Sequence, residues 1–135
     1  MALPNGAGGF QLGDGNRSEP VMGYASAPVT ATDTATLTAA QLLNGIILAT
    51  PTAAADYTLP TVADFEAGGI SSASEGNTFD FVIINLASSN YDITLLTNTG
   101  WTITSGGVMV VQEASSARFR ARKTSATTWQ LYRIA

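Results

Sequence analysis

The second half of the chain, from Thr78 onward, is a series of short segments that alternate between strand-like and turn-like composition. The strand-like segments are TFDFVIINL, YDITLLT, WTIT, VMVVQE, SSARFRARK and SATTWQLYRI. The groups SSN, NTG and SGG that lie between them are typical of turns. Short strands at roughly ten-residue spacing, divided by such turns, predict an all-β sandwich or barrel.

Two further observations narrow the arrangement of these strands. The segment TFDFVIINL is apolar on both of its faces after Asp80, which predicts a strand enclosed between two layers of structure. No repeat of fixed period is visible in the chain, so we do not expect a solenoid or a propeller.

The first half contains one well-marked short helix. Thr38 and Gln41 have the spacing of a capping box, in which each side chain bonds the backbone N–H of the other residue. Gly45 stands where a left-handed residue ends a helix, so the helix is predicted over residues 39–44. Strands are further predicted at 46–50 and 57–60, and a second helical turn is predicted within TVADFEAGG.

The N-terminal segment differs from the rest of the chain in composition. Residues 1–20 are rich in glycine, and their few large apolar side chains are Leu3, Phe10 and Leu12. Such a segment cannot offset the entropy of ordering by burying its own side chains. We therefore divide the chain into an extended glycine-rich arm at 1–30 and a β-sandwich domain at 31–135. The arm is either a frayed terminus or a segment that another subunit orders.

Targeting signals and membrane spans are not expected. The start, MALPNGAGGF, lacks the basic and apolar regions of a signal peptide. No apolar run reaches the length that a membrane-spanning helix needs. The sequence thus predicts no membrane partner.

The chain lacks several of the residue types that most often serve in catalysis and metal binding. It has no cysteine and no histidine, which removes thiol nucleophiles, the commonest general base and the commonest metal ligand. Two distant carboxylates such as Asp80 and Asp92 could still form a glycosidase-like pair, but scattered acids in β-proteins are usually solvated. The sequence predicts no enzyme, no cofactor, and no catalytic, cofactor-binding or metal-ligating residue.

Positive charge is concentrated at the C-terminal end. Arg17 is the one cation before residue 118, and all ten acids lie at or before Glu113. The net charge is 1 − 10 = −9 for residues 1–117 and +5 for residues 118–135, which together give the −4 of the whole chain. This asymmetry is the feature most typical of a binding surface.

Within SARFRARK the arginines alternate with other residues. On a strand, Arg118, Arg120 and Arg122 therefore share one face and repel one another unless negative charge lies opposite. Nucleic acid is not the expected partner, because it needs a wider basic surface and the whole chain is acidic. Three hypotheses stay open: pairing with acids of the same subunit, a seam between subunits, or an acidic partner protein. The acids that could pair within the subunit are Asp80, Asp92 and Glu113.

Aromatic residues raise a sugar-binding alternative, because exposed rings can stack on pyranose rings. Packing in the core or in an interface is the simpler interpretation. The residues concerned are Tyr57, Tyr91, Trp101, Trp129 and Tyr132.

Three stretches together resemble small structural proteins of tailed bacteriophages, the capsid decoration or cement proteins. They are TATDTATLTAAQLLNGIILATPTAAADYTLPT, the strand FDFVIINL and the closing SARFRARKTSATTWQLYRI. The resemblance covers most of residues 30–135 and is one of pattern, without a catalytic motif. It implies a jelly-roll-like β-sandwich, associated as a homotrimer on the capsid exterior after assembly in the host cytoplasm.

That resemblance implies a virion structural protein that bridges neighbouring major capsid subunits. The arm residues Leu3, Phe10 and Leu12 and the arginine row would then be the candidate interface. The alternative function is a trimeric receptor- or glycan-binding head domain of a phage fibre. Reversing the charge of all three arginines should abolish trimers or head binding under the first interpretation.

Overall fold

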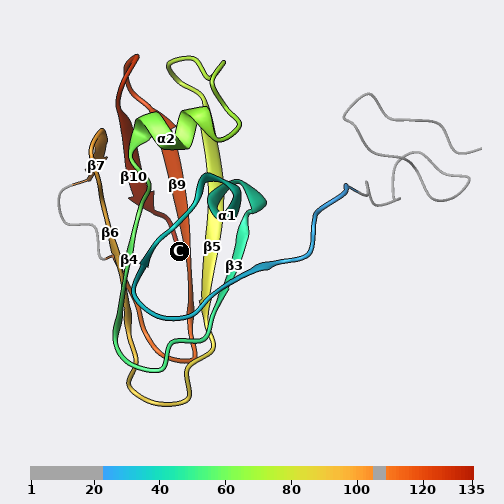
Figure 1. The fold of residues 1–135 in the computed structure, drawn as a ribbon, viewed down its shortest axis with the longest axis vertical. Helices are drawn as coiled ribbons and strands as arrows, with labels where there is room; N and C mark the ends of the chain where they lie inside the picture. The colour runs from blue at the N-terminus through green and yellow to red at the C-terminus, as the bar shows by residue number, and fades with distance from the viewer. Residues whose placement is uncertain (1–22, 105–108) are drawn as a thin grey trace, which may run out of the picture.

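The computed structural model describes residues 23–104 and 109–135 of the chain. These residues form two β-sheets and two short helices (Figure 1). Hydrophobic side chains pack between the sheets. The sequence-based expectation of a β-sandwich with one or two short helices is confirmed at this level. The predicted contacts Leu3, Phe10 and Leu12 lie outside the described residues.

The two sheets differ in size, and both mix parallel and antiparallel strands. In spatial order, the larger sheet consists of β1 (Val29–Ala31), β3 (Ile46–Ala49), β5 (Thr78–Asn85), β9 (Ser116–Lys123), β10 (Trp129–Arg133) and β7 (Trp101–Ile103). The smaller sheet consists of β2 (Ala35–Thr36), β4 (Ala55–Thr58), β6 (Ile93–Leu96) and β8 (Val110–Val111).

The chain winds between the sheets from β1 to β6. Strands β1, β3 and β5 pair in parallel in the larger sheet, and β2, β4 and β6 pair in parallel in the smaller one. This part of the chain therefore coils through the two sheets of the sandwich, and each turn passes once through each sheet. Helices and loops of unequal length separate the turns, which explains why no fixed period marks them in the sequence.

The antiparallel part follows this winding. Strand β9 lies antiparallel between β5 and β10, and β8 lies antiparallel to β6. Five of the eight strand pairs in the described chain are parallel. The Greek keys of a jelly roll are antiparallel, so the sandwich has a different connectivity from the one implied by the resemblance.

The first helix, α1 (Ala39–Asn44), begins and ends where the sequence predicts. The Thr38 hydroxyl accepts from the Gln41 N–H, and the Gln41 side chain accepts from the Thr38 N–H, which completes the capping box. Gly45 ends the helix in the left-handed region, with φ of 94°. This helix leads directly into β3 and so fixes where the second turn of the winding starts.

The second helix, α2 (Val62–Ala67), begins after Thr61, whose hydroxyl accepts from the Asp64 N–H. It buries Val62 and Phe65 against the core, whereas α1 buries Leu42. Gly100, in the turn before β7, has φ of 90°, and a Cβ there would lie 2.7 Å from the Val62 side chain. Glycine is therefore required both by the backbone conformation and by the close approach of α2.

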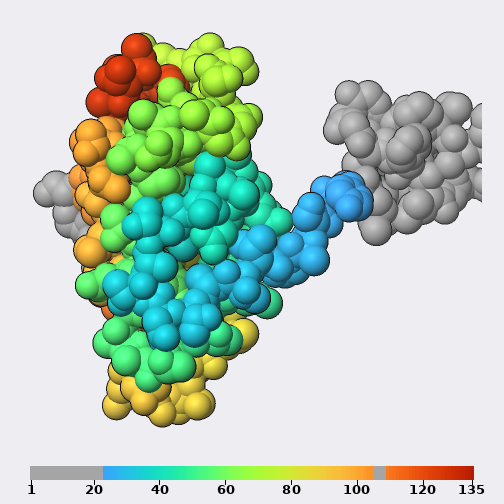
Figure 2. Space-filling view, viewed as in Figure 1, coloured from blue at the N-terminus to red at the C-terminus, as the bar shows by residue number. Residues whose placement is uncertain are grey.

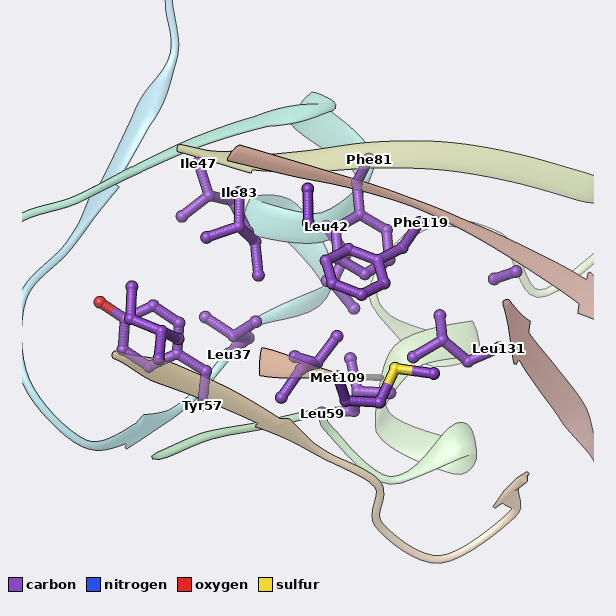
Figure 3. Packing of buried hydrophobic residues seen from close by; sticks show 14 of the residues in the cluster. Leu37, Leu42, Ile47, Tyr57, Leu59, Phe81, Ile83, Met109, Phe119 and Leu131 are labelled. Atoms are coloured by element: carbon purple, nitrogen blue, oxygen red, sulfur yellow. The ribbon is translucent and has the colours of Figure 1, made fainter. Parts of the chain in front are cut away.

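The core lies between the two sheets (Figure 3). Ile47, Ile83 and Phe119 reach it from the larger sheet, and Tyr57 reaches it from the smaller one. Phe81 stacks on Phe119 with ring centroids 5.3 Å apart. Burial of these large apolar side chains is the dominant stabilising term of a fold that contains no disulfide.

Strand β5 does not match the expectation of a strand covered on both faces. Phe81, Ile83 and Asn85 point into the core, but Val82 and Ile84 point away from it and are only half-buried. The two helices contribute their buried side chains to the space between the sheets. The outward side of β5 is therefore left uncovered by the helices and strands that the structure describes.

The part of the predicted arm that the structure describes is extended. Residues 23–28 form neither helix nor strand, are exposed throughout and run away from the body of the fold (Figure 2). Val29 and Thr30 belong to β1, the edge strand of the larger sheet. The β-sandwich thus begins at the end of the segment that was assigned to the arm.

Candidate functional site

The candidate site is the side of the larger sheet that points away from the core, which we call the outer face. Its side chains come from alternate positions of β3, β5, β9 and β10 and are aligned by the register of the ladders. They are Ile46, Leu48, Thr78, Asp80, Val82, Ile84, Ser116, Arg118, Arg120, Arg122, Gln130 and Tyr132.

Strand β9 supplies the positive charge of the outer face. Its residues alternate strictly between exposed and buried along the whole strand. Arg118, Arg120 and Arg122 are exposed, as the two-residue period of a strand predicts. The arginine row is therefore confirmed as a single row on one surface.

Asp80 on β5 binds two of these arginines. Arg118 donates through Nη2 to Asp80 Oδ2 at 2.6 Å, and Arg120 donates through Nε and Nη2 to the two carboxylate oxygens at 2.7 and 2.9 Å. Arg120 lies directly opposite Asp80 in the ladder, which explains its two-pronged geometry. The hydrogen bonds from Arg120 and then from Arg118 lower the pKa of Asp80 to about 2.

Among the described residues, no acid lies opposite Arg122 in either ladder. Its neighbours across the two ladders are Thr78 and Gln130, both uncharged. Among the described residues, the three ion pairs of the chain leave Arg122 out. The hypothesis of pairing within the subunit thus applies to Arg118 and Arg120 and does not apply to Arg122.

The other two candidate acids have different roles. Asp92 accepts a hydrogen bond from the backbone N–H of Glu113 at 3.2 Å and makes no ion pair with the arginine row. Glu113 itself lies in the connection between β8 and β9. Of the three acids named from the sequence, only Asp80 has the strand register that brings it to an arginine.

The part of the outer face that β3 and the adjoining end of β5 supply is aliphatic. Ile46, Leu48, Val82 and Ile84 lie on β3 and β5, next to the arginine row. Ile46 is 39% exposed and the other three are half-buried. Within the described residues no helix covers this part of the sheet, where aliphatic groups lie beside charged ones.

The last cation of the strand points the opposite way. Lys123 is buried, and its ammonium group donates a hydrogen bond to Glu66 Oε1 of α2. The indole Nε1 of Trp129 donates to the same oxygen at 2.9 Å. These two hydrogen bonds, that of Lys123 first, lower the pKa of Glu66. Lys123 therefore belongs to the interior, although it directly follows the exposed arginine row in the sequence.

The large aromatic residues pack in the interior. Tyr57, Trp101 and Trp129 are buried, and Phe65 contacts both tryptophans at centroid distances of 5.4 and 5.5 Å. The Trp101 indole also donates to the Pro60 carbonyl at 2.7 Å. Core packing, the simpler of the two sequence-based interpretations, is confirmed for these three rings.

The surface also has hollows. One of about 500 Å³ lies between the start of α1 and α2. Its one carboxylate, Asp64, already accepts a hydrogen bond from the Thr61 hydroxyl at 2.8 Å. In the described residues no group of three or more acids could hold a metal ion, and no helix is long and apolar enough to cross a membrane.

Comparisons with protein-family models, with curated proteins and with solved structures find no match for this chain.

Sequence reasoning missed two parts of this arrangement. The aliphatic half of the outer face was interpreted as covered, because alternating burial cannot be recognised in a run such as FVII, where both faces are apolar. The pair between Lys123 and Glu66 was missed because the two residues are 57 positions apart. No local pattern links residues at such a separation.

Proposed function

We propose that this chain is a virion structural protein that binds the outside of an assembled phage head as a homotrimer and cements neighbouring major capsid subunits. The observation that carries the proposal is the outer face, where aliphatic side chains and three arginines lie on a sheet surface without a cover in the described chain. The sequence resemblance of residues 30–135 to decoration proteins supports the same assignment.

The mechanism that we propose is mass action. A protein that binds only the assembled lattice stabilises that lattice by its binding free energy. Three linked copies convert weak single contacts into avid attachment. A sandwich with a rigid core suits this role, because a pre-ordered face loses little conformational entropy on binding.

The proposal requires the sandwich and not the jelly-roll connectivity, because a partner contacts the sheet face whatever the order of its strands. Leu3, Phe10 and Leu12 stay predicted contacts of the N-terminal segment with capsid or with a neighbouring subunit. The proposed role needs no catalysis, no cofactor, no nucleic acid and no membrane, and it places the protein on the capsid exterior.

Sedimentation with undecorated heads tests this function. The purified protein is mixed with heads at increasing concentration, pelleted and quantified, and its mass in solution is measured by light scattering. We expect saturation at a fixed copy number per head and the mass of a trimer. Glycan-array binding without co-sedimentation would instead assign the fibre-head function.

A variant set connects the sedimentation assay to the outer face. Replacing Arg118, Arg120 and Arg122 together by Gln should prevent co-sedimentation. The control is Thr36→Glu, which also makes the chain more acidic but lies on exposed β2 of the smaller sheet. Unchanged binding of the triple variant would show that heads are bound by another surface.

A further inference from the structure

The outer face carries more positive charge than its own residues neutralise. Three arginines and one acid give it a net charge of 3 − 1 = +2 within the described residues. Arg118 and Arg120 share the single carboxylate of Asp80, and Arg122 has none. An exposed cluster of this kind attracts carboxylates from outside the subunit.

The donors of this cluster are largely unused. Each guanidinium group has five N–H donors, and the bonds to Asp80 use one of Arg118 and two of Arg120. The side chains of Arg118 and Arg120 are 52% and 47% exposed, so solvent or a partner can reach their other donors. Asp80 therefore orders two guanidinium groups without saturating them.

The row has a defined spacing. Residues on the same face of a strand repeat about every 6.6 Å, so the three arginine positions span about 13 Å. A partner that matches them presents acidic side chains at a similar repeat, as an extended strand does. Arg122 is the position where a new carboxylate would meet no competing acid, since Thr78 and Gln130 flank it.

The aliphatic part of the outer face, formed by β3 and β5, indicates which other side chains the partner surface should carry. Val82 lies between Ile46 on β3 and Arg118 on β9, so the apolar and cationic areas are continuous. A matching surface would place aliphatic groups beside its acids. Burying both together excludes water from the ion pairs and strengthens them.

A second copy of this chain does not supply that surface by pairing outer face to outer face. Such a contact would bring two faces of like charge together. Among the described residues, Asp80 is the only acid on each outer face. The outward side of the smaller sheet is also a poor match, because Asp56 is the only acid that its strands carry. Neither of these two sheet faces of a second copy matches the arginine row, and we therefore take a different protein as the partner.

We propose that the outer face recognises an acidic protein surface in which carboxylates at strand-like spacing lie beside aliphatic side chains, with Arg122 as the unneutralised anchor. This inference rests on the proposed function, since it names the chemistry of the surface that the cement protein binds. It assigns the outer face to the partner protein and leaves the contacts between subunits to other surfaces.

The experiment uses the full chain and a fluorescein-labelled peptide that repeats Glu-Val-Glu-Thr, and binding is followed by fluorescence anisotropy. An extended peptide of this sequence places all its carboxylates on one face, so it probes the arginine row. A matched peptide carries Gln in place of Glu. We expect binding of the Glu peptide alone, weakening as NaCl is raised from about 0.05 to about 0.5 M, because salt screens exposed ion pairs. Arg122→Gln should weaken binding at least about tenfold, whereas Thr36→Glu should leave it unchanged.

Several outcomes would overturn the inference. They are equal binding of the Gln peptide, no binding of either peptide, wild-type affinity of Arg122→Gln, or tighter binding of double-stranded DNA than of the Glu peptide. Conversion of trimers to monomers by Arg122→Gln would also overturn it, because the row would then be a seam between subunits.

Failure of this inference and failure of the proposed function give different results. If heads are bound by wild type and by Arg122→Gln equally, the cement function stands and the acidic-surface inference is wrong. If the Glu peptide is bound through Arg122 but heads are not, the inference stands and the cement function is wrong.

Discussion

Both faces of strand β9 carry positive charge, but one face lies in the core and the other is exposed to solvent. On the inward side, Phe119 packs on Phe81, and Lys123 is enclosed with Glu66 and Trp129. On the outward side, Arg120 pairs with Asp80 in contact with solvent. Positive charge on this strand thus lies in the core at Lys123 and on the solvent-exposed outer face at the neighbouring Arg122.

The largest expected effect is on the inward face. Phe119→Ala removes a fully buried ring and should lower the free energy of unfolding by about 3–5 kcal/mol. Urea unfolding followed by fluorescence of the buried tryptophans measures the change. The adjacent Arg120→Ala is the control and should have a much smaller effect. Equal effects at the two positions would contradict the assignment of the two faces.

The second effect concerns the buried ion pair. Glu66→Ala leaves the Lys123 ammonium group without its partner inside the protein, which should cost about 3 kcal/mol of stability. A double variant, Lys123→Met with Glu66→Gln, removes both charges and should recover most of this loss. The same urea unfolding assay compares the three proteins. A single variant as stable as the wild type would show that the pair is not needed to bury Lys123.

A smaller effect on stability, which depends on pH, is expected for the exposed ion pairs of Asp80 with Arg118 and Arg120. The pKa of Asp80 falls from 3.8 to about 2 in the folded chain, so its pairing stabilises the fold above about pH 4. That contribution is lost as pH falls from about 4 towards 2, because the folded protein then takes up a proton on Asp80 less readily than the unfolded chain. Stability measured at several pH values should therefore fall more steeply for wild type than for Asp80→Asn. Parallel curves would mean that the ion pair does not form in solution.

The smallest effect is expected at Arg122. Because it has no ion pair among the described residues, Arg122→Ala should change the free energy of unfolding by less than about 0.5 kcal/mol. Thermal unfolding of the purified variant checks this. A clear loss of stability would show that Arg122 has a role in the subunit itself, which would weaken its assignment as a partner contact.

Much of the fold could be predicted, because its signals are local. Thr38, Gln41 and Gly45 define α1 through contacts within a few residues of sequence. The alternation in SARFRARK placed the three arginines on one face, because strand geometry depends only on the backbone. The short β-strands and their turns likewise indicated a sandwich.

The connectivity was not predictable in the same way. Parallel pairing of β1 with β3 and of β3 with β5 joins segments that lie far apart in sequence. Such ladders leave no period when helices and loops of different lengths intervene. The resemblance to decoration proteins implied antiparallel Greek keys, and the structure shows how a mixed sandwich arises from equally short strands.

The sequence by itself determined where helices and strands form and which side chains share a face, because those properties follow from neighbours along the chain. Only the tertiary structure decided that Asp80 meets Arg118 and Arg120 while Arg122 is left alone, and that Lys123 turns inward to Glu66. The physical reason is that ion pairing depends on which residues tertiary packing brings together across tens of positions, by strand register for Asp80 and by the placement of α2 for Glu66. The basic residues of SARFRARK therefore lie in two environments: Lys123 is buried in the core, and the three arginines are on the outer face.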